Sequence, residues 1–252
     1  MSLARVASVL SLLALVGCGS PSHDARKPGT RKTDTTRSPL RSASPSLVAI
    51  PGGAGHLAAM APKKGLTLRD KPNGSVIAHL RPKTDWGSPT VVWATGRRGN
   101  WLSVVATALP NNRLGWLDVR HDRPRMWRSR LGLFADLSER TLVLRRGNRV
   151  IRRVPVDIGA ASTPTPVGHF AVTDKLLPAA GVAYYGCCLL ALSGHQPKLR
   201  PGWAGGDRIA IHGSPARQVG SAASAGCLRA SDSDLRALME LVPIGTPVVI
   251  RA

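Results

Sequence analysis

The chain has 252 residues, with 35 Lys and Arg against 14 Asp and Glu, and a formal net charge of +21 at pH 7. Its 43% hydrophobic content is enough to bury a core and excludes a wholly disordered chain. Only 4% of the residues are aromatic, and the 26 Gly and 20 Pro disfavour a helical bundle. Length and composition therefore predict one or two domains with many turns.

The excess positive charge is spread along the chain. The densest basic clusters, Arg145-Arg146 and Arg152-Arg153, are short and are separated by a turn sequence. A nucleic-acid-binding arm would carry a longer run of Lys and Arg, so we expect no specific nucleic-acid partner. Attraction to an anionic cell envelope is compatible with this charge.

Residues 1–17 have the features of a signal peptide. Arg5 precedes an apolar run from Val6 to Val16, which is too short to span a bilayer comfortably. The run leads into Gly17-Cys18, and this segment resembles a bacterial lipobox, in which cleavage precedes a cysteine that is then lipidated. We therefore expect a lipid anchor on Cys18 and an extracytoplasmic protein on the cell-wall side of the membrane. An ordinary secreted chain is the alternative.

Residues 18–58 contain mainly Ser, Thr, Pro, Gly and scattered basic residues, as in Thr33–Pro39. Almost no apolar period is present, and such a stretch cannot offset the entropy lost on ordering. We predict a disordered tether between the lipidated cysteine and the folded part of the chain.

Residues 59–126 are predicted to form a small β-domain. Apolar runs of strand length, such as Val91–Trp93, alternate with turn sequences such as Gly96–Asn100. The order of three segments resembles bacterial Src-homology-3 (SH3)-type domains: Leu68–Pro72, Gly99–Val104 and Arg113–Leu117. The resemblance implies a small β-barrel of a kind that often holds glycan or peptide in cell-wall proteins.

Tryptophan is concentrated around this middle segment. Of the 6 tryptophans in the chain, all but Trp203 lie between residues 86 and 127: Trp86, Trp93, Trp101, Trp116 and Trp127. Core packing and ligand binding are both compatible with this cluster, so the sequence assigns no binding residue here.

Residues 127–252 are predicted to be mainly β, with one principal helix. Thr141–Leu144 and Val150–Ile158 flank a Gly147-Asn148 turn, which predicts a hairpin. A capping box at Ser231–Asp234 predicts a helix that ends before Pro243. Four further segments have strand character: Gly168–Thr173, Cys188–Ser193, Arg208–Ile211 and Val248–Arg251.

A histidine and a cysteine in this segment are candidates for nucleophilic chemistry. His212 ends a strand-like run, and Cys227 follows a Gly- and Ala-rich loop, residues 220–226. A thiol is mostly protonated at neutral pH and needs a base, for which His is suited. The loop could also turn the amides of Gly226 and Cys227 toward a developing oxyanion. Alone the pair is a weak signal, since a buried Cys and a structural His would give the same pattern.

The surrounding residues strengthen this interpretation. Residues 131–252 closely resemble a YkuD-type L,D-transpeptidase domain, through five segments: Ser162–Phe170, Leu192–Gly194, Ile209–Ser214, Ser224–Arg229 and Leu241–Ile250. The resemblance implies that Cys227 is the nucleophile, that His212 is the base, and that the Gly213 carbonyl fixes the tautomer of His212. It also implies that neither a metal nor an organic cofactor is required.

Three further positions follow from the same resemblance. Arg229 matches a substrate-binding position that holds an anionic donor peptide, with a structural ion pair as the alternative. Ser224 matches the family's Ser or Thr three residues before the cysteine, a substrate-binding position at which it is expected to order the loop. Ala225 replaces the His that this family usually has two residues before the cysteine. Alanine is tolerable if the position contributes its backbone amide; if an imidazole is needed, the protein is slower or takes other acceptors.

Cys187 and Cys188 are adjacent, and this spacing does not fit a structural zinc site. Two small apolar residues and a vicinal disulfide, formed in an oxidising compartment, are both compatible with the sequence.

The sequence therefore predicts a monomeric, lipid-anchored L,D-transpeptidase that acts on peptidoglycan stem peptides. The expected reaction cross-links the third residues of two stems through a cysteine thioester. One alternative is an L,D-carboxypeptidase, if water resolves the acyl-enzyme. The other is a catalytically impaired wall-binding lipoprotein, with Ala225 as the sign of lost activity. The sequence leaves open the acceptor's diamino acid and the ligand of the middle domain.

Overall fold

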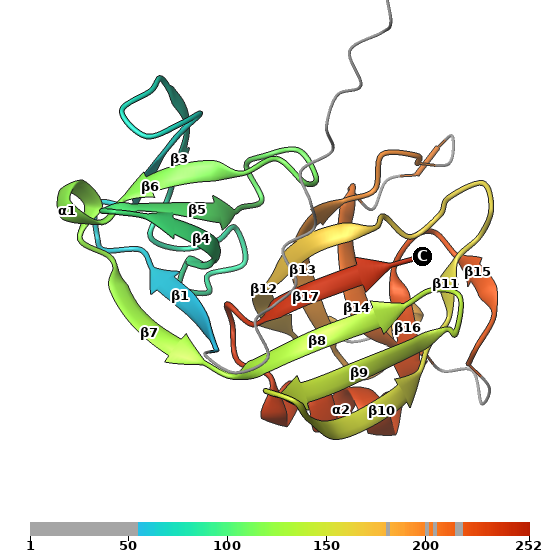
Figure 1. The fold of residues 1–252 in the computed structure, drawn as a ribbon. Helices are drawn as coiled ribbons and strands as arrows, with labels where there is room; N and C mark the ends of the chain where they lie inside the picture. The colour runs from blue at the N-terminus through green and yellow to red at the C-terminus, as the bar shows by residue number, and fades with distance from the viewer. Residues whose placement is uncertain (1–54, 180–181, 200–201, 204–205, 215–218) are drawn as a thin grey trace, which may run out of the picture. The chain divides into compact units, whose positions relative to one another are not determined.

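The computed structural model describes residues 55–179, 182–199, 202–203, 206–214 and 219–252, all within one compact unit, Pro45–Ala252. The predicted signal peptide, Cys18 and most of the predicted tether lie outside the described residues. The described chain is mainly β, as the sequence predicted, and its strands form two large sheets and one small one (Figure 1). No described helix is both long enough and apolar enough to cross a membrane.

The first sheet has seven strands in the order β3-β2-β6-β5-β4-β1-β7. Its strands, with the short helix α1 that follows β6, are β1 (His56–Met60), β2 (Leu66–Arg69), β3 (Val76–Leu80), β4 (Val91–Arg98), β5 (Trp101–Val105), β6 (Gly115–Asp118), α1 (Val119–Asp122) and β7 (Arg125–Ser129). Because β1 begins at His56, residues 56–58, which we expected in the tether, belong to this sheet.

Alternation of buried and partly exposed side chains builds the core of the first sheet. Leu66 and Leu68 on β2, Leu102 and Val104 on β5, and Leu117 on β6 are all buried in one apolar cluster. Residues two apart on a strand point to the same face, so these short runs place their apolar side chains on one side.

The second sheet has eight strands in the order β10-β9-β8-β17-β12-β13-β14-β16. Its strands are β8 (Leu131–Asp136), β9 (Thr141–Arg146), β10 (Arg149–Pro155), β12 (Gly168–Leu176), β13 (Leu189–His195), β14 (Arg208–Ser214), β16 (Leu228–Ser231) and β17 (Pro247–Arg251). The small third sheet pairs β11 (Ile158–Gly159) with β15 (Ala222–Ser224). A 3₁₀ turn, η1 (Ala183–Tyr185), precedes β13.

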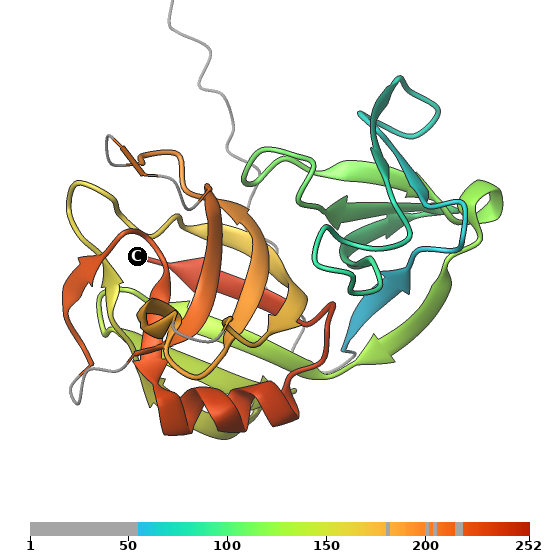
Figure 2. The ribbon, with the colours of Figure 1, turned by 180° about the vertical axis from the view of Figure 1, so that it is seen from behind.

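The predicted hairpin and helix of this region are confirmed. β9 and β10 pair with Arg146 opposite Arg149. Helix α2 (Asp232–Leu241) begins after Ser231, whose hydroxyl accepts a hydrogen bond from the Asp234 N–H. Two buried leucines of this helix, Leu235 and Leu238, join the core of the second sheet. The helix lies against the end of the sheet that holds β13, β14 and β16 (Figure 2).

The two large sheets meet through a small apolar cluster. Trp93 on β4 and Val105 on β5 pack with Ala171 on β12. Polar contacts extend this interface: Asn111 donates to the His195 carbonyl at 2.6 Å, and its side-chain oxygen accepts the His195 N–H at 2.8 Å. The region that carries the candidate catalytic residues is therefore joined to the first sheet by specific contacts.

The tryptophans of the middle segment have unequal environments. Trp93 is 3% exposed, so core packing explains its position. Trp86, on the loop between β3 and β4, is 46% exposed and does not belong to any core cluster of the described residues. Trp101, Trp116 and Trp127 are partly buried.

Candidate active site

The structure brings His212, Cys227 and Arg229 to neighbouring strands. β14 and β16 run parallel, with His212 opposite Arg229. Cys227 directly precedes β16 and lies two residues before Arg229, so the pairing of β14 with β16 brings the segment that carries Cys227 close to His212. Cys227 lines a cavity of about 80 Å³ together with Tyr184 and Tyr185.

His212 is fully buried and held in one orientation. Its Nδ1 lies 2.7 Å from the Gly213 carbonyl oxygen, so Nδ1 carries the hydrogen and donates it. Burial lowers the pKa of His212 to about 4, which outweighs the opposing effect of the Gly213 carbonyl. Nε2 is buried and has no hydrogen-bond partner among the described residues. At neutral pH the ring is therefore uncharged, and Nε2 has a lone pair able to accept a proton.

Cys227 is a free cysteine of intermediate exposure. Burial raises the pKa of its thiol, while a hydrogen bond from the Ala210 backbone and the charge of Arg229 oppose that rise. The resting group is therefore the neutral thiol at neutral pH. Attack on a carbonyl then requires a base that removes the thiol proton, and His212 is suited to this step.

Tyr185 contacts His212 and lines the same cavity as Cys227. Its ring meets His212 edge-on, with 5.2 Å between the ring centroids. Burial raises the pKa of Tyr185, and the charge of a Cys227 thiolate raises it further. The site therefore surrounds the imidazole with aromatic rings, and the resulting loss of solvent explains why His212 is hard to protonate.

Position 213 has no room for a side chain. A Cβ atom there would lie 2.1 Å from Asp232 Oδ1 and 2.9 Å from the Cys187 nitrogen. Asp232 Oδ1 accepts the Cys187 N–H at 3.0 Å, which holds the carboxylate against the glycine. Glycine at 213 thus lets the chain pack closely while its carbonyl orients His212.

Ser224 organises the loop that precedes the cysteine. Its fully buried hydroxyl donates to the Cys227 carbonyl at 2.6 Å and accepts the Gly226 N–H at 3.0 Å. These two contacts connect the Ser224 side chain to the backbone of Gly226 and Cys227, and the role expected for Ser224 stays a prediction. We expected the Gly226 and Cys227 amides to bind an oxyanion. In this structure the Gly226 N–H donates to the Ser224 hydroxyl instead, which leaves the Cys227 N–H as the candidate donor to an oxyanion.

Two residues that sequence reasoning missed also hold this loop. The Gln196 amide nitrogen donates to the Ala225 carbonyl at 3.1 Å and to the Pro164 carbonyl at 3.0 Å. Asp157 Oδ1 accepts from the Gly220 and Ser221 backbone at 2.9 and 2.7 Å. Gln196 and Asp157 are distant in sequence from the loop, and nothing local to either residue marks it as a partner.

Arg229 contacts an aromatic ring. Its Nη2 donates to the Tyr184 hydroxyl at 3.1 Å, and its guanidinium carbon lies 5.3 Å from the centre of the Tyr184 ring. The structural ion pair that we considered for Arg229 is not among the salt bridges of the described residues. Arg229 does not itself line the Cys227 cavity, which it adjoins through the ring of Tyr184.

Cys187 and Cys188 form a disulfide beside the site. The Cys188 carbonyl accepts the Gly213 N–H at 3.1 Å, so the disulfide-bonded residues contact the residue that follows His212. Within the described residues, no group of three or more His, Cys, Asp or Glu is arranged to hold a metal ion.

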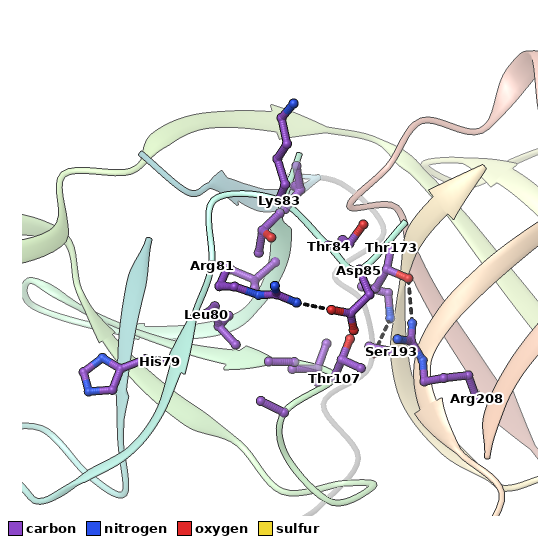
Figure 3. Close-up of a pocket in the computed structure, with 17 residues that line it drawn as sticks. His79, Leu80, Arg81, Lys83, Thr84, Asp85, Thr107, Thr173, Ser193 and Arg208 are labelled. Atoms are coloured by element: carbon purple, nitrogen blue, oxygen red, sulfur yellow. Dashed lines mark hydrogen bonds and ion pairs between the residues drawn. The ribbon is translucent and has the colours of Figure 1, made fainter. Parts of the chain in front are cut away.

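A larger cavity, of about 340 Å³, lies between the two large sheets and lacks Cys227 and His212. Figure 3 shows its polar residues: Arg81 points to Asp85, while Arg208 donates to the Thr173 hydroxyl at 2.8 Å. Although it is larger, this cavity does not include Cys227, the free cysteine of the described residues, so thiol chemistry favours the smaller cavity. Arg208 lines both.

Comparisons with known proteins find relatives for the part of the chain that contains Cys227 and His212. Residues 131–250 match the model of the YkuD family, described as the L,D-transpeptidase catalytic domain. The YkuD protein of Bacillus subtilis is 32% identical over 116 residues, which cover 45% of this chain and 62% of that protein. The chain thus spans about three fifths of this curated relative.

Solved structures also resemble the chain. An L,D-transpeptidase from Mycobacterium smegmatis is 17% identical, with a TM-score of 0.39 and coverage of 78% of this chain and 82% of that one. One from Xylanimonas cellulosilytica is 26% identical, with a TM-score of 0.36 and coverage of 49% and 61%. The family match and these relatives agree that residues 131–250 are similar to a YkuD-type L,D-transpeptidase catalytic domain.

Proposed function

We propose that the protein is a peptidoglycan L,D-transpeptidase in which Cys227 forms a thioester with a donor stem peptide. The observation that carries this proposal is the buried, uncharged His212, whose Nδ1 is fixed by the Gly213 carbonyl and whose Nε2 has no partner among the described residues. A base held in one tautomer beside a neutral thiol, within a YkuD-type domain, is suited to acyl transfer.

In the first step, Cys227 Sγ attacks the carbonyl that joins the third residue of the donor stem to its terminal D-residue. His212 Nε2 takes the thiol proton as the C–S bond forms. The Cys227 N–H stabilises the oxyanion of the tetrahedral intermediate. As the C–N bond breaks, His212 returns the proton to the departing amine, and the donor remains as a thioester.

In the second step, the side-chain amine of a neighbouring stem attacks the thioester. His212 accepts a proton from this amine and returns it to the sulfur, so that an amide joins two third-position residues and the thiol is restored. Arg229 holds a carboxylate of the donor peptide, since its guanidinium is positioned by Tyr184 and makes no ion pair among the described residues.

Ala225 bears on the acceptor step. Its carbonyl accepts from Gln196, so this residue helps to fix the loop through its backbone. This contact supports the interpretation that position 225 acts through its main chain, and that the transfer step proceeds without a second imidazole.

The test is the intact mass of the full chain after incubation with a carbapenem, whose strained ring acylates a reactive thiolate. We expect one adduct on the wild type and none on Cys227→Ala. Absence of an adduct on the folded wild type would overturn the proposal and favour a wall-binding protein. Incubation with a tetrapeptide-bearing muropeptide then separates the two activities: a cross-linked dimer supports transpeptidation, and a tripeptide alone supports L,D-carboxypeptidase action.

We further propose that the enzyme works outside the cytoplasmic membrane, anchored through a lipid on Cys18, and that the first sheet is an SH3-type domain. The apolar run before Cys18 and the short strands of the first sheet support these two assignments. Metabolic labelling with a fatty acid, compared between the wild type and Cys18→Ala, tests the anchor: label on the wild type alone is expected.

A further inference from the structure

The cavity that Cys227 lines also has one lining residue from the first sheet's part of the chain, outside residues 131–252. Trp86 lines it, although every other lining residue lies at position 184 or later. This tryptophan is 46% exposed, whereas Trp93 of the same region is 3% exposed. An exposed indole in the wall of a cavity that holds a candidate nucleophile is a candidate contact for the substrate.

The loop that carries Trp86 is closed by its own hydrogen bonds. Residues Lys83 and Pro89 form an isolated antiparallel bridge. Inside it, the Thr84 N–H donates to the Ser88 carbonyl at 2.8 Å, and the Ser88 N–H donates to the Thr84 hydroxyl at 3.2 Å. Trp86 is therefore presented from a tight hairpin, so its position is determined by the backbone.

A second contact ties this hairpin to the catalytic region. The Thr84 hydroxyl donates to Asp174 on β12, and the Asp174 carboxylate is fully buried. Figure 3 shows Thr84 and Asp85 lying beside Thr173 and Arg208. Because the hydrogen bond reaches a buried residue of the second sheet, the loop is fixed relative to the strands of the site.

Arg208 completes this wall. Its guanidinium carbon lies 5.1 Å from the centre of the Trp86 ring. Its Nε donates to the Leu192 carbonyl at 2.9 Å, so β13 holds the guanidinium beneath the indole. Arg208 begins β14, the strand that also carries His212, and it lines the Cys227 cavity with Trp86.

The chemistry of this wall fits a peptide that carries a carboxylate. The indole offers an apolar face to an aliphatic side chain, and the Arg208 guanidinium offers a positive charge to an anion. The carboxylates of Asp174, Asp207 and Asp85 also act on Arg208, and Asp207, which lines the cavity, is paired with His195 at 2.9 Å. Tyr184 lines the same cavity and has Arg229 on its ring, but Arg229 itself does not line the cavity. Arg208 is therefore the arginine in the wall of this cavity that can contact an anionic peptide.

We propose that Trp86, supplied by the first sheet, is a specificity-determining residue of the transpeptidase site. With Arg208 it binds a carboxylate-bearing segment of a stem peptide, away from the bond that reacts. This inference rests on the proposed function, because it assigns part of the substrate to a wall of the same cavity.

The first test compares Trp86→Ala with Trp86→Phe and with Trp116→Ala in the full chain. Trp116 is a matched control, since Arg98 lies 5.8 Å above its ring on the first sheet and it does not line the Cys227 cavity. For a tetrapeptide-bearing muropeptide, we expect Trp86→Ala to lower kcat/KM about tenfold, mainly by raising KM. Trp86→Phe should recover most of this loss, and Trp116→Ala should stay within about twofold of the wild type.

The outcomes separate this inference from the proposed function. If the wild type neither forms the carbapenem adduct nor turns over the muropeptide, the proposed function fails. If the wild type is active and both alanine variants have the same KM, the inference alone is overturned. Should Trp86→Ala fold poorly, Trp86→Gln keeps the test decisive, because it removes the aromatic ring while keeping a large side chain, and a folded Trp86→Gln variant with the wild-type KM would also contradict the inference.

The second test addresses the charge. The wild type should prefer a tetrapeptide substrate with free α-carboxylates over its amidated form by about tenfold in kcat/KM, and Trp86→Ala should reduce that preference. Equal kcat/KM values of the wild type for the two peptides would overturn the assignment of a carboxylate to this wall.

Discussion

Each of the two large sheets contains a buried histidine with the same electrostatic signature, yet only one is suited to catalysis. His56 on β1 and His212 on β14 are 5% and 0% exposed. Burial lowers the pKa of each to about 4, and each has a buried Nε2 without a partner among the described residues. A shifted pKa by itself therefore does not identify the base.

The difference lies in what surrounds each ring. His212 donates to the Gly213 carbonyl and meets Tyr185 edge-on, and Tyr185 lines the same cavity as Cys227. For His56, burial is the sole cause of the shift. Desolvation makes an imidazole neutral, but a fixed tautomer and a neighbouring thiol are needed before the neutral ring can act as a base.

The largest expected effect distinguishes His212 from His56. His212→Ala should slow carbapenem acylation of Cys227 by about 10²- to 10⁴-fold, because the thiol loses its proton acceptor. His56→Ala should leave the acylation rate of the folded fraction unchanged. Stopped-flow or mass-based rates for the two variants decide the matter, and an equal loss in both would show that burial alone accounts for the effect.

The pH dependence of thiol reactivity sharpens the same point. Because burial raises the pKa of Cys227 and lowers that of His212, we expect no stable thiolate–imidazolium pair at rest. Alkylation by iodoacetamide should rise about tenfold per pH unit from pH 6 to 8, as the thiolate fraction does below its pKa. A plateau in the wild-type rate that begins near pH 6.5 would contradict this expectation.

Acid stability should make the two histidines look alike. Each is harder to protonate when folded than when unfolded, so its contribution to the free energy of unfolding is fully present above pH 6.5 and is lost as the pH falls toward 4. The loss is about 3 kcal/mol for each residue. Denaturant titrations from pH 7 to pH 4 should show that His56→Ala and His212→Ala each lose less unfolding free energy than the wild type. If both variants lose as much as the wild type over this pH range, the expectation is contradicted.

The smallest expected effect compares two buried serines. Ser224→Ala removes the contacts to the Gly226 N–H and the Cys227 carbonyl, and should cost about 1–3 kcal/mol of unfolding free energy. Ser103→Ala on β5, where Thr95 lies 3.0 Å from the hydroxyl, should cost about 1 kcal/mol. Of the two variants, only Ser224→Ala should also slow acylation of Cys227, because only Ser224 holds the loop that precedes this cysteine. Equal acylation rates in Ser224→Ala and Ser103→Ala would contradict this role of Ser224.

The agreement between sequence and structure was closest where the determinants are local. The Gly147-Asn148 turn predicted the β9–β10 hairpin, because a two-residue turn fixes the pairing of the strands on either side. Ser231 predicted the start of α2 through its hydroxyl. His212 and Cys227 were found through motifs that lie within a few residues of each.

The prediction was weaker where partners are far apart in the chain. Gln196, Asp157 and Asp232 looked like ordinary polar residues, although each holds a backbone segment of the site. Their importance depends on contacts made across the fold.

The sequence by itself determined the β class, the order of the principal strands, the helix start and the His–Cys pair, because turns, caps and strand periodicity act over a few neighbouring residues. Only the tertiary structure decided that the buried His212 ring lies against Tyr185 and that Trp86 lines the Cys227 cavity. Both outcomes depend on contacts between separate elements of the fold, and no local pattern encodes such contacts.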